Sequence, residues 1–172
     1  MFMDRVLGVF RLDPAVFEAI EHDQGATSQA LLVVAIVALM RALGSGFQAT
    51  WTDASFLGNF IGALIWTFAG WLVWSVISYW VGTAFFRGVA DLGEMLRVIG
   101  FAYAPQFLAI IPCVGFLVGV VWSLAAGFVA IRQGLDLDNV RALFTILAGL
   151  LVYVIGSLLI SAFFGGLGMI FG

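Results

Sequence analysis

The chain has 172 residues, of which 63% are hydrophobic and 10% charged, and its formal net charge is −3. A soluble domain of this length cannot bury so much apolar surface, and a disordered chain contains far less of it. A single cysteine excludes an internal disulfide, and a single histidine excludes a multi-histidine metal site. The composition therefore predicts a small all-α polytopic membrane protein.

Residues 1–27 are the most polar part of the chain, and we interpret them as a cytoplasmic tail. The opening "MFMDRVLGVFRLDP" has neither the apolar run nor the cleavage site of a signal peptide. Asp13 is a good N-cap and Pro14 suits the first helical position, so a short helix is expected there. Its apolar and polar residues fall on opposite faces, as in an interfacial helix: Val16, Phe17 and Ile20 against Glu18, Glu21 and His22.

Five apolar segments follow, each near the ~20 residues that a hydrocarbon core of ~30 Å requires. They cover residues 28–43, 60–86, 95–111, 114–131 and 142–164, and residues 165–172 form a glycine-rich tail. The second segment would extend about 40 Å as a helix, so it must tilt or protrude from the bilayer. We expect one membrane domain of five transmembrane helices over residues 1–172.

The arginines predict the orientation of these spans. With a cytoplasmic N-terminus and an external C-terminus, six of the seven lie inside: Arg5, Arg11, Arg87, Arg97, Arg132 and Arg141. This distribution satisfies the positive-inside rule. If the third segment were a re-entrant loop, four spans would remain and the count would fall to four against three. We therefore favour five spans.

Three short motifs have simpler explanations than the sites that they resemble. "GSGFQA" at 44–49 spells a dinucleotide fingerprint, but it follows a membrane helix and not a strand, so we interpret it as a helix-ending loop. Glu18 and His22 have metal-ligand spacing, and a solvated helix face is favoured instead. The polar run 136–139 lacks the glycine and distal glutamate of a calcium loop, so capping explains it. No cofactor, metal or nucleic-acid partner is expected.

Arg41 is the only charge well inside a predicted span. Intramembrane ionisable residues are functional candidates, whereas long side chains near a helix end snorkel to the interface. If Arg41 is buried, Asp53 or a backbone carbonyl is its natural partner.

The stretch "GFAYAPQFLAIIP" at 100–112 predicts a polar break in the third span. Pro105 removes a backbone donor, so the helix loses a hydrogen bond there. Tyr103 and Gln106 are polar enough to re-satisfy the broken helix or to line a cavity. A kink with local hydrogen bonding and a small-molecule site are both open.

Small and aromatic residues recur at spacings that favour helix packing. One set shares a face of the second span: Asn59, Gly62, Trp66, Gly70 and Trp74. A second set lies in the fourth and fifth spans: Gly115 and Gly119, four residues apart, and Gly149 and Gly156, seven apart. We expect packing within one chain to explain most of these positions, with self-association or another membrane protein as the alternative.

Three segments of the chain resemble bacterial members of the Yip family, Ypt/Rab-interacting-protein-like membrane proteins. They are "LDPAVFEAIEHDQGATSQA", "GFAYAPQFLAIIP" and "VGFLVGVVWSLAAGFVAIRQGLDLDNVRALFTIL". The resemblance implies five spans and a cytosolic N-terminus. It also implies roles known for eukaryotic members, which shape endomembranes, bind one another and contact prenylated small GTPases. This sequence lacks their acidic-Leu-Tyr-Gly-Pro segment and has a short tail, so a GTPase partner is not expected.

The absence of acids from the predicted spans removes the usual acid–base groups, so we expect no enzymatic activity. Our leading hypothesis is a membrane-organising protein or accessory subunit that acts through helix–helix association. The alternative is a transporter, channel or lipid-handling protein that uses the break at Tyr103, Pro105 and Gln106 together with Arg41.

Overall fold

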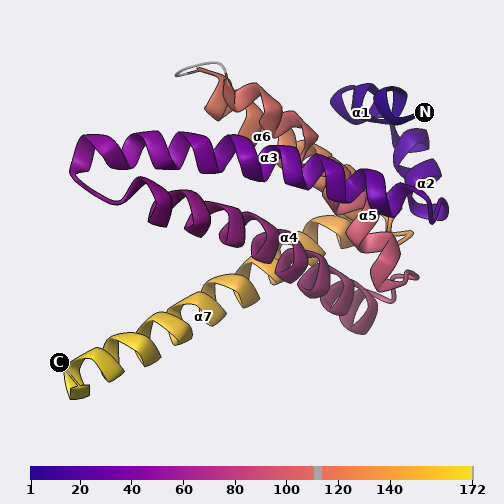
Figure 1. The fold of residues 1–172 in the computed structure, drawn as a ribbon. Helices are drawn as coiled ribbons and strands as arrows, with labels where there is room; N and C mark the ends of the chain where they lie inside the picture. Colours follow the sequence, from indigo (N-terminus) through magenta and orange to yellow (C-terminus); the bar gives the residue numbers. More distant parts are fainter. Residues whose placement is uncertain (111–113, 172) are drawn as a thin grey trace.

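The computed structural model describes residues 1–110 and 114–171, and this part of the chain is helical without a strand. Seven α-helices and two 3-10 segments follow one another: α1 Phe2–Phe10, α2 Pro14–His22, α3 Ala26–Ala49, η1 Thr50–Thr52, α4 Phe56–Phe86, α5 Leu92–Ala102, η2 Ala104–Ile110, α6 Val114–Gln133 and α7 Asn139–Phe171. The chain begins at one end of the molecule, and α7 extends towards the opposite end (Figure 1).

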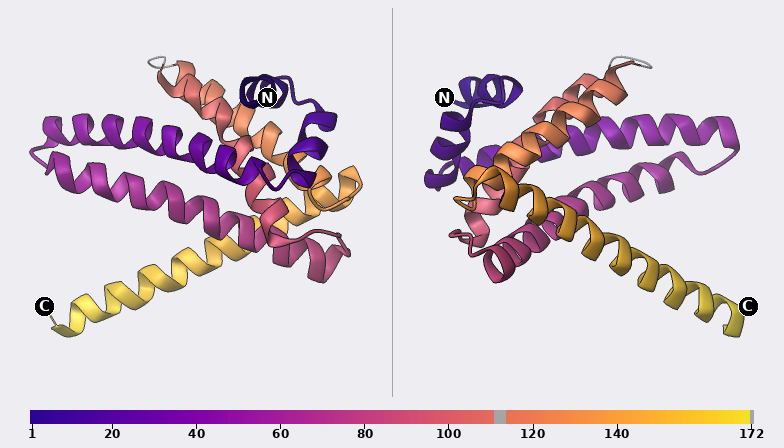
Figure 2. Two further views of the ribbon diagram at one scale, coloured as in Figure 1. Left: turned by 45° about the vertical axis from the view of Figure 1, so that its right-hand side comes forward. Right: turned by 180° about the vertical axis from the view of Figure 1, so that it is seen from behind.

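The helices α3 and α4 form a long hairpin, in which they lie side by side in both views of Figure 2. A tight turn joins them, in which Asp53 adopts a left-handed conformation (φ 53°). The Ser55 hydroxyl oxygen then accepts from the Gly58 amide at 3.1 Å and caps α4. Near the turn, a Cβ on Gly46 would lie 2.8 Å from the Phe56 ring, so glycine permits this close approach.

The α3 helix corrects our interpretation of "GSGFQA". We expected the first span to end at its glycines, but α3 runs on through Gly44 and Gly46 to Ala49. Glycine costs a helix only about 1 kcal/mol, which packing against α4 offsets.

A second hairpin consists of α5, η2 and α6, and it packs across α3 (Figure 1). Asp91 and Glu94 form a reciprocal capping box that begins α5. The α5 helix ends at Ala102 and the chain continues as η2, so the predicted third span is two helical pieces and not one continuous helix.

The helices α1 and α2 pack against α5 and α6 and do not extend away from the protein. Phe17 and Ile20 of α2 are fully buried there, as the amphipathic pattern predicted. The α1 helix was not predicted, although its apolar residues follow helical spacing: Phe2, Val6, Val9 and Phe10. The indole N–H of Trp122 on α6 donates to the Phe10 carbonyl at 2.8 Å and ties α1 down.

Three helices are long and apolar enough to cross a membrane: α3, α4 and residues Asn139–Gly156 of α7. The described apolar part of α6, Leu117–Gln133, is shorter. The last helix continues to Phe171, through the glycine-rich residues that we expected to follow the final span. Five spans and their orientation stay predictions.

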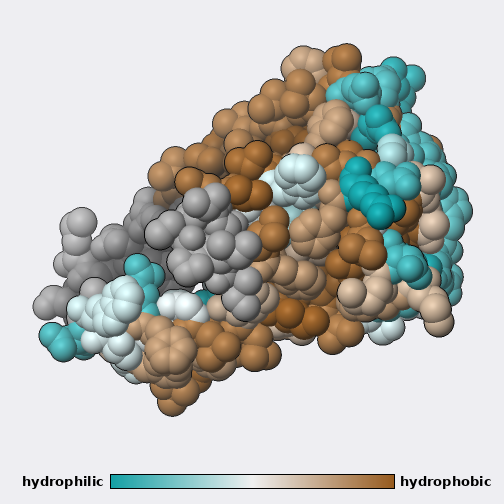
Figure 3. All heavy atoms as spheres, turned by 90° about the horizontal axis from the view of Figure 1, so that it is seen from above, coloured by the Kyte–Doolittle hydropathy of each residue, from teal (hydrophilic) through white to brown (hydrophobic). Residues whose placement is uncertain are grey.

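Apart from Arg41 on α3 and Asp53 in the α3–α4 turn, most of the charged residues gather at one end of the molecule. The α4–α5 and α6–α7 connections meet there, where the Val89 amide donates to the Leu135 carbonyl at 3.1 Å. The tail joins them, since Gln133 of α6 donates to Glu18 of α2 at 3.1 Å. Figure 3 shows hydrophilic residues at this end and a broad hydrophobic band beside them. The predicted clustering of six arginines therefore has a structural counterpart.

Candidate functional site

A cavity of about 370 Å³ lies where α3, α4, α5 with η2, α6 and α7 meet. Arg41, Tyr103 and Gln106 all line it, so the two polar features that the sequence singled out separately occupy one site. Residues of the predicted α4 face line the opposite wall: Trp66, Gly70 and Trp74. Apolar residues complete it: Ile99, Val120, Leu124, Ile131, Ile146 and Leu150.

The break between α5 and η2 positions two of the polar side chains. Pro105 has no N–H to donate, and the α-helix ends three residues before it, at Ala102. The backbone N–H of Gln106 instead donates to the Tyr103 carbonyl at 2.9 Å, which continues the chain as a tighter turn. Gly70 of α4 lies beside the tyrosine, since a Cβ built on it would be in ordinary van der Waals contact with the Tyr103 hydroxyl at 3.9 Å.

Arg41 reaches the cavity from α3. Within the part of the chain that the structure describes, its guanidinium forms no ion pair within 4.0 Å, and the partnership with Asp53 that we considered is absent. Asp53 belongs to the α3–α4 turn, and α3 continues for eight residues after Arg41 before that turn begins. The arginine is also exposed. Because no Asp or Glu is among the described residues that line the cavity, its cation has no carboxylate there to balance it.

Two buried polar atoms at the cavity have no hydrogen-bond partner among the described residues: Gln106 Oε1 and Ser123 Oγ. Buried polar groups are almost always paired, so these two atoms require a partner that the described part of the chain does not provide. The sequence analysis missed Ser123, although a serine inside the otherwise apolar segment 114–131 was a signal for it.

The predicted packing face of α4 divides into two parts. Trp66, Gly70 and Trp74 face the cavity, whereas Asn59 and Gly62 are exposed beside an open surface hollow. Among the residues that the structure describes, no atom comes within 4 Å of a Cβ built on Gly62. Within this part of the chain Gly62 therefore has no packing partner, contrary to our main expectation.

The remaining small residues also divide. Gly149 of α7 packs on α4, where its Cβ would lie 3.3 Å from Ile77 and 3.6 Å from Trp74. Gly119 is buried, and Gly156 faces open space. Gly115 lies outside the residues whose surroundings the structure describes.

A polar cluster forms at the charged end of the molecule, where Glu18 and His22 are accessible to solvent, as a solvated helix face predicts, but Glu21 is buried. Glu21 is only 3% exposed, because α5 packs over it and Arg97 donates to its backbone carbonyl at 2.9 Å. Burial, reinforced by the nearby Glu18 carboxylate, raises the Glu21 pKa to about 7. Ligand atoms of Glu18, Glu21 and His22 lie within 4.8 Å of one another, as the helical spacing indicated.

In a comparison with protein families, this chain matches the Yip1 domain over residues 7–172. The chain belongs to the Yip1 family. Its resemblance to Yip proteins is thereby confirmed, and so is its nature as a membrane protein of a non-enzymatic family. No curated protein and no solved structure matches it.

Proposed function

We propose that this Yip1-family protein organises the membrane without enzymatic activity, by lateral association with further copies of itself. The observation that carries the proposal is the open glycine face of α4, Gly58-x-x-x-Gly62, with the exposed Asn59 between the two glycines. We also propose that it lies in a bacterial inner membrane, with five spans and a cytoplasmic N-terminus.

Several glycines elsewhere in the fold have an evident reason within the chain, whereas Gly62, like Gly44, Gly127 and Gly156, has open space beside it. A Cβ on Gly100 would lie 2.9 Å from Ala30, and one on Gly134 would lie 2.8 Å from Val98. Gly62 meets no such constraint, although glycine is unfavourable inside a helix. Small residues at this spacing let two membrane helices approach closely, where dispersion and weak Cα–H···O contacts hold them.

The hollow beside this face supports association through it. It has a volume of about 480 Å³ and is lined by six residues: Ser45, Gly58, Asn59, Gly62, Ala63 and Trp66. Asn59 points its amide along its own helix, where Nδ2 donates to the Ser55 carbonyl at 3.0 Å. Its side-chain oxygen is therefore available to a donor from a second copy, which would be worth about 1–2 kcal/mol within a bilayer.

Replacement of Gly62 by leucine tests this proposal, since nothing in the chain obstructs the new side chain. Copies labelled with donor and acceptor dyes and reconstituted at low density in vesicles should show energy transfer that Gly62→Leu reduces strongly. Gly44→Leu is the matched control, because Gly44 is also helical and open but lies outside the hollow. Equal energy transfer in Gly62→Leu and the unaltered protein would reject the proposal.

The convergence of Arg41, Tyr103 and Gln106 supports a second candidate function, the handling of an amphiphile at the cavity. Lipid-handling sites need polar groups at bilayer depth beside apolar walls, and this cavity has both. Gln106→Leu keeps the approximate size of the side chain and removes its amide. If the cavity serves transport, this variant should slow the transbilayer movement of a fluorescent lipid in proteoliposomes, and an unchanged rate would reject transport.

A further inference from the structure

We infer that the cavity binds the head group of an anionic lipid, with Arg41 as its counter-ion and the apolar walls holding the first part of an acyl chain. This inference deepens the second candidate function and rests on it. It specifies the charge and the chemical class of the ligand.

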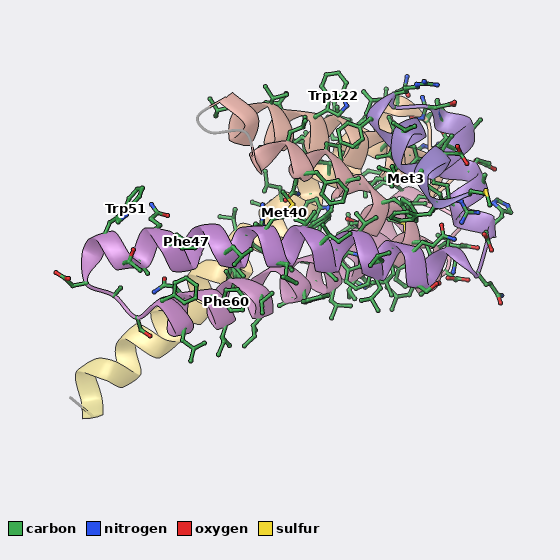
Figure 4. All side chains as sticks on the ribbon, turned by 45° about the horizontal axis from the view of Figure 1, so that its top comes forward. Met3, Met40, Phe47, Trp51, Phe60 and Trp122 are labelled. Carbon is green, nitrogen blue, oxygen red and sulfur yellow. The ribbon has the colours of Figure 1, made fainter. Side chains whose placement is uncertain are left out.

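The negative charge of the proposed ligand follows from the surroundings of Arg41. The acidic residues of the chain lie in the tail, the connections and the first turn of α5. Arg41 is eight residues from the end of α3, a distance of about 12 Å at ~1.5 Å per residue. Trp51, 86% exposed, projects from the turn beyond that end (Figure 4). An unpaired guanidinium at this depth is unfavourable, so it favours an anion that comes from outside the chain.

The polar atoms around the cavity fit a phosphate head group that also carries a hydroxyl. An arginine guanidinium and the hydroxyls of Tyr103 and Ser123 all donate to phosphate oxygens. Gln106 Oε1 needs a donor, which a glycerol hydroxyl supplies. One ligand of this kind pairs both of the orphaned atoms and neutralises the cation.

The walls and the edge of the cavity fit a lipid and not a soluble anion. About 370 Å³ is at the small end of ligand sites, which measure ~300–1,000 Å³. It therefore accommodates a head group and part of a chain, while the remainder stays in the bilayer. Trp66, Leu124 and Leu150 line the cavity yet are 67%, 67% and 49% exposed, so it opens sideways between apolar side chains.

Native mass spectrometry of the full-length protein in a neutral detergent measures this binding. Phosphatidylglycerol is the anionic probe, and phosphatidylcholine with the same chains is the zwitterionic comparison. We expect the protein to prefer phosphatidylglycerol by at least about tenfold, the scale of one charge-assisted contact. Arg41→Gln should abolish the preference, and Arg41→Lys should restore part of it.

Two further variants separate the possible failures. Arg11→Gln removes the same charge from an exposed position on the tail and should keep the preference. Gly127→Phe places a ring at the cavity, at a position where no described atom lies within 4 Å of a Cβ, and it should weaken the binding of both lipids. If Gly127→Phe changes neither lipid, the cavity is not a lipid site, and the second candidate function fails together with the inference.

Other outcomes overturn the inference alone. If Gly127→Phe weakens both lipids but the unaltered protein binds them equally, or Arg41→Gln keeps the preference, then the charge assignment is wrong. Full competition by millimolar inorganic phosphate overturns the assignment to a lipid, since the apolar walls would then contribute nothing to binding. Circular dichroism and the Tm of each variant show that the fold is kept.

Discussion

The buried carboxyl of Glu21 makes the stability of this protein depend on pH, and Glu21→Gln should remove that dependence. In the unfolded chain its pKa is near the ordinary value of 4.5, whereas burial raises it to about 7 in the fold. The folded state therefore binds the proton more tightly and loses stability as pH rises from about 4.5 to about 7. A difference of about 2.5 pKa units corresponds to a loss of about 3 kcal/mol in the free energy of unfolding, and this loss is complete above pH 7.

The substitution replaces the carboxylate with a neutral amide of nearly the same shape. At pH 8 the variant should be more stable by up to about 3 kcal/mol, which at ~2–4 °C per kcal/mol raises Tm by roughly 6–12 °C. Near pH 4.5 the two proteins should unfold at similar temperatures. Thermal unfolding in a neutral detergent across pH 4.5–8 measures this difference.

Asp4→Asn is the control for the loss of a negative charge, because Asp4 is exposed and pairs only with the N-terminal ammonium. It should leave the pH dependence unchanged. If Glu21→Gln has the same pH slope as the unaltered protein, Glu21 does not bear the raised pKa and the burial argument is wrong.

Three further predictions follow from the packing and the topology. Gly82→Ala should destabilise the protein by about 1–3 kcal/mol, because its Cβ would overlap the Leu135 side chain, whereas Gly62→Ala should stabilise it by up to about 1 kcal/mol in the same unfolding assay. Asp91→Ala should cost about 1 kcal/mol by the same measurement, since it removes the side chain that accepts from the Glu94 amide at 2.7 Å. Cys113, which the five-span topology places outside, should react with a membrane-impermeant maleimide in right-side-out vesicles and not in inside-out ones, and the reverse pattern would overturn the orientation.

Much of the fold was predictable because one-residue signals and apolar runs determine where helices begin. Asp13 caps α2, Pro14 is its first residue and Ser55 caps α4 through local rules that operate within a few residues. Helix ends were less predictable. The expected stop at Gly44 failed because a glycine in an apolar helix is tolerated when a neighbour such as α4 packs along it.

The residues of the cavity were predictable singly but their convergence was not. Pro105 shows in the sequence that a helix must break, and Arg41 shows that a charge enters a span. Neither residue predicts which helices will be neighbours, because that depends on which residues more than 60 positions apart in the sequence come together, as Arg41 and Tyr103 do at the cavity. Ser123 had only weak local signal, and Glu21 was misread because its helix face looks polar until α5 covers it.

The two proposals place self-association and lipid binding at opposite ends of one helix face on α4. The open half, around Gly62, has room for another backbone and lacks packing within the chain, whereas the closed half, around Gly70, faces the cavity. Trp66 lines both hollows, so its ring lies between the association face and the lipid site. A second copy seated on Gly62 would therefore contact the same indole as a bound lipid. If both proposals hold, self-association should depend on the lipid, and Trp66→Ala should weaken that coupling more than it weakens either event alone.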